Sequence, residues 1–306
     1  MTHSRLLHLG LFIALLLAAS ARTARAQDLE PRAYSASPIN ATFLVAGVGR
    51  SSGGVVTDPS LPVQDVHATL GVLTAGVGHT FDLFGRTALV LGAMPFARAR
   101  ATGAVAGDIR EATRTGTADA RVKLSVNFLG GAARNARAFA GAKRTTIVGA
   151  SVTAIVPTGQ HLREKLVNLG SNRWAIKPEV GVSVPVRRWT LDAYAGVTFF
   201  GANDEFYPGT STLEQEPVAA LQGHASYTIR PRLWAAFDAT WYSGGTTSID
   251  GVSKENLQRN SRVGATLSLP LASRQSLKIA YSTGATTRIG GDFDTIAVAW
   301  QMLWLR

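Results

Sequence analysis

The segment from Thr117 to Phe128 alternates between polar and apolar residues at every position. Its polar members are Thr117, Asp119, Arg121, Lys123, Ser125 and Asn127, and its apolar members are Ala118, Ala120, Val122, Leu124, Val126 and Phe128. Successive side chains of a β-strand point to opposite faces, so this period gathers the polar groups on one face. The segment therefore predicts a strand that has water on one side and hydrocarbon on the other.

Similar alternation recurs along most of the chain, near residues 40–49, 66–81, 86–100, 113–128, 145–157, 172–185, 189–201, 217–230, 232–242, 261–271, 275–284 and 293–304. Several runs reach the roughly nine to eleven residues that a tilted strand needs to cross a bilayer, whereas strands of soluble sandwiches usually have about five or six. The connections alternate between tight turns and long polar loops, as in bacterial outer-membrane barrels. We therefore predict an all-β protein, a single closed antiparallel transmembrane β-barrel of about twelve strands.

One connection, residues 129–144, does not fit this scheme. It would form a long link on the periplasmic side, where turns are usually short, and it has room for one short helical stretch. A mistaken strand count is the competing explanation.

The N-terminal residues have the pattern of a secretory signal peptide. Arg5 precedes an apolar run from Leu6 to Ala19, and Ala24-Arg25-Ala26 forms an A-x-A ending. We expect cleavage after Ala26, which divides the chain into a signal peptide (1–26) and a barrel (27–306). An uncleaved membrane anchor is the alternative, although the run is shorter than a spanning helix requires. An exported barrel predicts a location in the bacterial outer membrane.

The composition restricts the possible partners. There is no cysteine, which excludes disulfides and thiolate metal sites. Without the three arginines of the signal peptide, the net charge of +11 falls to about +8. An exported chain rarely meets nucleic acid, so we predict that this charge favours anions in the lumen or contacts anionic lipopolysaccharide. The expected partners are outer-membrane lipid and a small-molecule solute.

Charged residues at inward positions of successive strands are the candidate solute path. The predicted basic wall consists of Arg98, Arg100, Arg121, Lys123, Arg173 and Lys177. The polar groups expected to oppose it are Glu179, Asp192, His224 and Asp238. In a narrow lumen such charges either line a selective passage or pair across it and close it.

Several segments carry a family resemblance: Ser51–Pro62 (SSGGVVTDPSLP), Thr146–Ser151 (TIVGAS), Lys165–Trp174 (KLVNLGSNRW) and Asp292–Trp300 (DFDTIAVAW). With them the mature chain resembles the outer-membrane barrel proteins named for the meta-cleavage pathway of phenol degradation. The resemblance implies a transporter or porin-like role in the uptake of aromatic compounds, and it brings no catalytic residues. The chain ends in Trp304-Leu305-Arg306, where many barrels end on an aromatic residue.

An enzymatic alternative rests on His224, Ser226 and Asp238. Their spacing resembles the His-x-Ser plus Asn arrangement of outer-membrane phospholipases, in which histidine activates serine. Those enzymes present the triad to lipid, whereas the alternation here turns His224 and Ser226 toward the lumen. A lumen hydrogen-bond network is the simpler interpretation, and we predict no enzyme. No cofactor or metal is expected either, because His67 and His79 are too far apart on one strand to share an ion.

The sequence therefore predicts an outer-membrane channel or transporter that passes small solutes, aromatic or anionic in type, by passive diffusion. The alternative is a closed barrel with a structural or partner-binding role. A lipid hydrolase is the least favoured interpretation.

Overall fold

The computed structural model describes residues 30–57, 63–105 and 108–305. The predicted signal peptide and its cleavage site lie outside these residues. Within them, one antiparallel sheet of thirteen strands forms the body of the molecule. Its members are β1 (Ala41–Val56), β2 (Val63–Leu83), β3 (Arg86–Val105), β4 (Asp108–Thr117), β5 (Ala120–Leu129), β6 (Ile147–Val156), β7 (Ala175–Val186), β8 (Trp189–Phe200), β11 (Val218–Arg230), β12 (Leu233–Gly244), β15 (Gln258–Ala272), β16 (Gln275–Thr286) and β17 (Gly290–Leu305).

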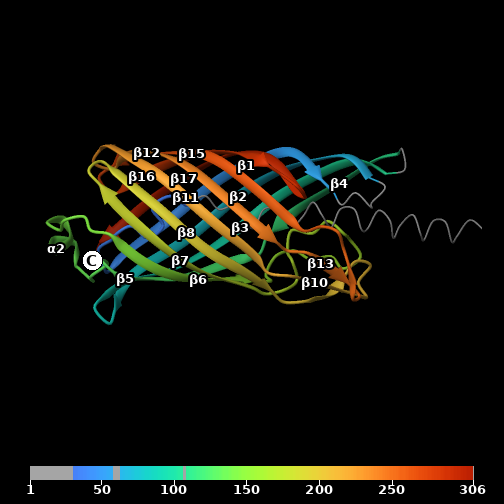
Figure 1. Cartoon of the computed structure of the whole chain (residues 1–306), viewed down its shortest axis with the longest axis horizontal. Helices are drawn as coiled ribbons and strands as arrows, with labels where there is room; N and C mark the ends of the chain where they lie inside the picture. Colours follow the sequence, from blue (N-terminus) through green and yellow to red (C-terminus); the bar gives the residue numbers. More distant parts are fainter. Residues whose placement is uncertain (1–29, 58–62, 106–107, 306) are drawn as a thin grey trace, which may run out of the picture.

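The sheet closes because β1 pairs with both β2 and β17. Both β4 and β5 pair with β3, one after the other, so together they act as a single strand of a twelve-strand barrel. Figure 1 shows the tilted strands wrapped into one cylinder. The fold prediction is confirmed. The irregular link before β6 contains helix α2 (Ala136–Ala140), which is the short helical stretch expected there.

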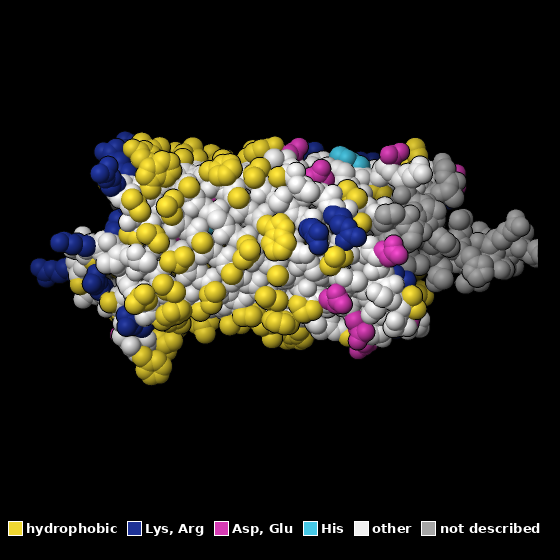
Figure 2. Space-filling model, viewed as in Figure 1, with side chains coloured by type: hydrophobic (Ala, Val, Ile, Leu, Met, Phe, Trp, Pro, Cys, Tyr) yellow, Lys and Arg dark blue, Asp and Glu magenta, His cyan; other side chains and the backbone are white. Residues whose placement is uncertain are grey.

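The outer surface of the barrel carries an apolar belt. Outward side chains such as Leu73, Val180 and Phe237 are 59%, 55% and 59% exposed, and Figure 2 shows hydrophobic side chains along the middle of the cylinder. Arg121 and Lys123, on the opposite face of β5, line a cavity inside. The predicted register is therefore correct along this strand. In the described part of the chain, no helix combines the length and the hydropathy needed to span a bilayer.

The long alternating segment that gave the strand prediction is interrupted at Ala118 and Asp119. Proline has no N–H to donate to a ladder, and β3 changes partner around Pro95: Ala93 pairs with β5 and Phe96 pairs with β4. The carboxylate of Asp119 accepts hydrogen bonds from the backbone N–H groups of Gly159 (3.1 Å) and Ser171 (2.9 Å). The break thereby fixes the extracellular loop 157–174 to the barrel wall.

Two further differences concern the extracellular side. Parts of residues 50–65 and 101–112, which lie between the strands predicted from the sequence, extend strands β1, β2, β3 and β4 beyond the belt. Residues 202–216 and 243–260, which the strand prediction leaves as connections, contain a second sheet of four short strands, β9 (Asn203–Phe206), β10 (Ser211–Gln215), β13 (Thr247–Ile249) and β14 (Val252–Ser253). Leu166, Phe206 and Leu213 form a small buried cluster in this region.

The hairpin arrangement of this small sheet is held partly by Asp250, whose carboxylate accepts a hydrogen bond of 2.8 Å from the backbone N–H of Thr212. That hydrogen bond stabilises the ionised form, so it lowers the pKa of Asp250. The sheet is thus an ordered cap at the extracellular end of the barrel.

Candidate functional site: the barrel lumen

The first described residues, Glu30 to Asn40, cross the lumen before β1 begins; we call residues 30–40 the plug segment. Tyr34 is only 1% exposed, although it belongs to no strand or helix. The segment leaves the lumen at the periplasmic end, where the backbone N–H of Ile39 donates to the carbonyl of Arg134. The hydroxyl of Thr80 on β2 donates to the carbonyl of Pro38 at 2.7 Å.

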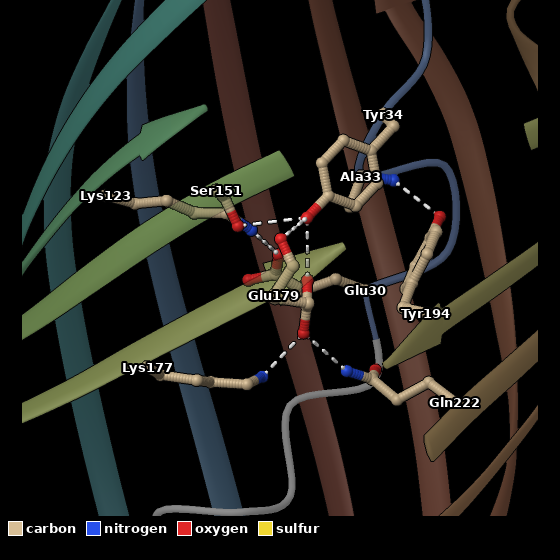
Figure 3. Close-up of polar contacts among 9 residues, drawn as sticks. All are labelled: Glu30, Ala33, Tyr34, Lys123, Ser151, Lys177, Glu179, Tyr194 and Gln222. Carbon is tan, nitrogen blue, oxygen red and sulfur yellow. Dashed lines mark hydrogen bonds and ion pairs between the residues drawn. The ribbon is translucent and has the colours of Figure 1, made fainter. Parts of the chain in front are cut away.

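Tyr34 and its neighbour Ala33 are held by a network of hydrogen bonds to β6, β7 and β8 (Figure 3). Its hydroxyl donates to the carboxylate of Glu179 at 3.1 Å and lies 3.0 Å from the hydroxyl of Ser151. Next to it, the backbone N–H of Ala33 donates to the hydroxyl of Tyr194 at 3.0 Å. The two tyrosine rings meet edge to face, with centroids 5.1 Å apart.

Glu179 is the centre of this network. Its second carboxylate oxygen pairs with the ammonium of Lys177 at 2.7 Å and accepts a hydrogen bond of 3.2 Å from the amide of Gln222. A buried carboxylate is costly unless it is paired and hydrogen-bonded, and both oxygens of Glu179 have partners. One of those partners belongs to the plug segment, so the segment completes the network.

Arg32 fixes the periplasmic part of the plug segment. Its guanidinium donates to the hydroxyls of Ser226 (2.8 Å) and Thr228 (2.9 Å) on β11, and it stacks over the ring of Trp234 at 4.5 Å. At the other end, Glu30 forms an ion pair of 2.9 Å with Lys123 on β5. The contacts of Glu30, Arg32, Ala33 and Tyr34 described here thus go to strands between β5 and β12.

A cavity of about 520 Å³ lies between the plug segment and the extracellular loop 157–174. Strands β2 and β3 line it with uncharged side chains: Ala68, Leu70, Val72 and Thr74, followed by Leu91, Ala93, Pro95, Ala97, Ala99 and Ala101. The adjoining wall carries the charged residues Arg121 and Lys123 on β5 and Lys177 and Glu179 on β7, together with Glu30. Val167, Asn168 and Leu169 of the loop contribute to the extracellular side. The cavity therefore has one apolar wall and one charged wall.

Four of the residues predicted from sequence line this cavity from inside the barrel, namely Arg121, Lys123, Lys177 and Glu179, and a fifth, Arg100, borders its rim. Arg173 lies just before β7, where its guanidinium hydrogen-bonds to Gln215 of the cap and lies 4.9 Å from the ring centre of Phe200. It is 5% exposed, so it is buried at the extracellular end of the lumen.

Asp192, His224 and Asp238 are buried in a second polar cluster on β8, β11 and β12. His224 Nδ1 lies 2.7 Å from the carboxylate of Asp238, which also accepts a hydrogen bond of 2.7 Å from the hydroxyl of Thr266. Asp192 accepts a hydrogen bond of 3.3 Å from the backbone N–H of Arg32. Asp192 therefore holds the plug segment, whereas His224 and Asp238 join neighbouring strands of the barrel wall.

The enzymatic alternative required Ser226 to pair with His224. The hydroxyl of Ser226 instead accepts from Arg32 and lies 3.4 Å from the carbonyl of Thr190, to which it donates. Ser226 is completely buried. His224 therefore pairs with Asp238, and Ser226 is hydrogen-bonded to Arg32 of the plug segment. This geometry matches the predicted hydrogen-bond network of the lumen and not a serine activated by a histidine.

Arg98 and Arg100 do not face the lumen, which corrects their predicted orientation. On β3 the residues Ala97, Ala99 and Ala101 line the cavity, so by alternation both arginine side chains point outward. Arg100 borders the cavity rim, but 63% of its side chain is exposed and it pairs with Glu111 at 2.7 Å. The prediction was wrong because it assumed that charged residues of a strand point inward. On the extracellular side β3 extends beyond the apolar belt, so its outward charges can contact water.

The plug segment itself was missed by the sequence analysis. It is too short and irregular to show a period, and the contacts that hold it to the barrel wall are distant in sequence. The available signal was Tyr34, the only aromatic residue between Ala26 and Phe43. Among the described residues, no group of three or more histidine or acidic side chains is placed to hold a metal ion.

Comparison with known proteins agrees with the barrel geometry. The model of a family described as "Putative MetA-pathway of phenol degradation" matches residues 47–294. The chain belongs to this family. No curated protein matches the chain. The predicted resemblance to the phenol-degradation barrels is thereby confirmed.

Solved structures share the fold. An outer membrane channel from Pseudomonas putida F1 is similar at a TM-score of 0.78, with 19% identity over 90% of this chain and 100% of that chain. The β domain of the Bordetella autotransporter BrkA is similar at 0.53, with 11% identity over 85% of this chain and 99% of the other. The transport unit of the autotransporter AIDA-I from Escherichia coli is similar at a TM-score of 0.50, with 11% identity over 97% of this chain and 98% of that chain.

Proposed function

We propose that this chain is a bacterial outer-membrane channel that passes small amphipathic anions by passive diffusion. The fold, the apolar belt and the similarity to an outer membrane channel support the membrane location and the channel class. The observation that carries the choice of solute is the cavity above the plug segment, with its one apolar and one charged wall.

The charge of the cavity favours a single negative charge on the solute. Among its described lining residues inside the barrel, Arg121, Lys123 and Lys177 face two acids, Glu30 and Glu179, which leaves one positive charge in excess. Side chains of fixed charge set the selectivity of narrow pores. The alanine and leucine side chains of β2 and β3 offer the apolar surface that an aromatic or aliphatic body would cover. An aromatic carboxylate combines both properties.

The plug segment narrows the path on the periplasmic side of the cavity. Because Tyr34 and Arg32 bind the wall through several hydrogen bonds, we infer that the segment limits the size of the solute. Cleavage after Ala26, as we propose, would place a new N-terminus shortly before Glu30. A closed barrel with a structural role is the second candidate, and the occupied lumen is the observation in its favour.

Liposome swelling with matched solutes tests the proposal. Benzoate and benzylammonium share a ring and differ in the sign of their charge, so benzoate should enter faster through the wild-type barrel. Replacing two cavity cations, Arg121→Gln with Lys177→Gln, should remove that preference. The matched control Arg259→Gln changes an exposed arginine near the extracellular end of β15 and should leave it intact.

A second variant keeps the test decisive if solutes pass only slowly through the wild-type barrel. Deleting residues 30–37 removes the part of the plug segment that lies in the lumen, while β1 and the periplasmic contacts of Pro38 and Ile39 remain. If folded barrels of both forms admit neither ion, the closed structural barrel is correct and the channel proposal is wrong. Equal rates for benzoate and benzylammonium would retain the channel and reject its preference for anions.

A further inference from the structure

Two arginines outside the barrel lie on opposite sides of a glycine. Arg50 on β1 pairs with Gly71 on β2, and Gly71 pairs with Arg98 on β3. Neighbouring strands are about 4.8 Å apart, so the two arginine backbones are about 10 Å apart in one row. Both arginines are exposed, and both have outward parity on their strands.

Neither arginine has a hydrogen-bond or ion-pair partner among the described residues. This separates them from Arg100, which pairs with Glu111, and from the cavity cations that pair with Glu30 and Glu179. The strand neighbour of Arg50 on the other side is Ile296, which is apolar. Two exposed guanidinium groups therefore remain available for a ligand from outside.

Gly71 leaves the space between them open. A Cβ placed at Gly71 would meet only the carbonyl oxygen of Arg98, at 4.0 Å, so no side chain fills the outer surface there. Long arginine side chains can bend toward each other over such a gap. The planar guanidinium group binds a phosphate through two parallel hydrogen bonds, which favours phosphate as the shared ligand.

The position of the row indicates where this phosphate comes from. On the same three strands, the next outward-facing residues toward the periplasm are Val48, Leu73 and Phe96, which are 58%, 59% and 47% exposed. The next outward-facing residues toward the extracellular side are Ser52, Thr69 and Arg100. The row therefore marks the extracellular edge of the apolar belt on these strands, at the level where lipid headgroups meet hydrocarbon.

We propose that Arg50, Gly71 and Arg98 form a binding site on the outer wall of the barrel for the phosphate of a phosphorylated lipid in the outer leaflet. The acyl chains of the lipid cover Val48, Leu73 and Phe96, and the phosphate lies between the two guanidinium groups over Gly71. The hydroxyls of Ser52 and Thr69, 3.1 Å from each other, are one step beyond the site and suit the polar part of the headgroup. This site is independent of the lumen and of the proposed channel activity.

Thermal unfolding of the purified full chain in detergent tests the site, because a ligand that binds only the folded state raises the melting temperature. The probes are lipid A with two phosphates, the same lipid without phosphate, and inorganic phosphate. The variants are the double substitution Arg50→Gln with Arg98→Gln, and Gly71→Val, which keeps both charges and fills the gap. Arg259→Gln, on β15, is the matched control for loss of one exposed arginine.

We expect phosphorylated lipid A to raise the melting temperature of the wild type and of Arg259→Gln in the same concentration range. Loss of two charge-assisted contacts should weaken this response at least about tenfold in the double variant, and Gly71→Val should weaken it by a smaller factor. If the double variant does not fold, Arg50→Lys and Arg98→Lys replace it, since lysine keeps the charge but cannot bind bidentately. The dephosphorylated lipid should act equally on all forms.

Three results would overturn the proposal. They are an equal response of the wild type to lipid A with and without phosphate, an unchanged response of the arginine variants, and an equal effect of inorganic phosphate at the same concentration. The last result would show a simple anion effect without a lipid site.

Discussion

The two walls of the cavity use the same strand alternation with opposite results. On β2 and β3, the residues that line the cavity are small or apolar, and the cations Arg98 and Arg100 lie outside. On β5 and β7, Arg121, Lys123 and Lys177 lie inside, and the outer face is apolar. Alternation separates two sets of side chains, but the height relative to the lipid decides whether the outward set has to be apolar. Charge can therefore be outside wherever a strand extends beyond the hydrocarbon.

The plug segment provides the strongest test of this comparison, because the contacts that anchor Glu30, Arg32 and Tyr34 go to strands β5 to β12 and not to the uncharged wall of β2 and β3. Deleting residues 30–37 should raise single-channel conductance several-fold in planar bilayers, since it clears the lumen without removing a strand. The double substitution Arg32→Ala with Tyr34→Ala should give a smaller increase with more current noise. An unchanged conductance in both variants would show that the constriction lies elsewhere.

The polar cluster on β8, β11 and β12 should contribute more to the free energy of unfolding than the uncharged wall of the cavity does. Asp238→Ala removes the acceptor of both His224 and Thr266, and each buried group left without a partner costs on the order of 1–3 kcal/mol. The matched change on the uncharged wall, Thr74→Ala, should cost less than half as much. Urea unfolding monitored by tryptophan fluorescence measures both. Similar losses in the two variants would contradict the distinction between the walls.

The outer face offers a comparison of height alone. Val180 is exposed in the middle of β7, so Val180→Arg should destabilise the barrel by roughly 2–4 kcal/mol in lipid. Thr115 is exposed on β4 beside Arg98, and Thr115→Arg should cost at most about 1 kcal/mol there. Unfolding in phospholipid vesicles is the measurement. A cost at Thr115 as large as that at Val180 would place the row of Arg98 inside the hydrocarbon.

The smallest expected effect concerns the apolar wall. Leu70→Ser removes apolar surface from the cavity, which is worth on the order of 1–2 kcal/mol for a covering ring. Benzoate should pass through this variant a few times more slowly than through the wild type. The rate of acetate, which has no ring, should not change. A parallel loss for both anions would mean that the wall is structural and does not contact the solute.

The sequence was sufficient for the barrel because alternation is a local signal repeated strand after strand. It placed Arg121, Lys123 and Lys177 on the correct face for the same reason. It could not place Arg98, since alternation does not give the height of the lipid boundary. It also could not find the plug segment, because Tyr34 and Glu179 are 145 positions apart and only the closed barrel brings them together. Long-range contacts of an irregular segment leave no periodic trace.

The cavity has a consequence for kinetics. A solute that enters it meets loop 157–174 on one side and residues 30–40 on the other, so it must pass two barriers in series with a holding compartment between them. Transport through such an arrangement approaches a maximum rate as the outside concentration rises, because the compartment can hold only a limited number of solute molecules. A wide open pore would instead show flux that grows in proportion to concentration.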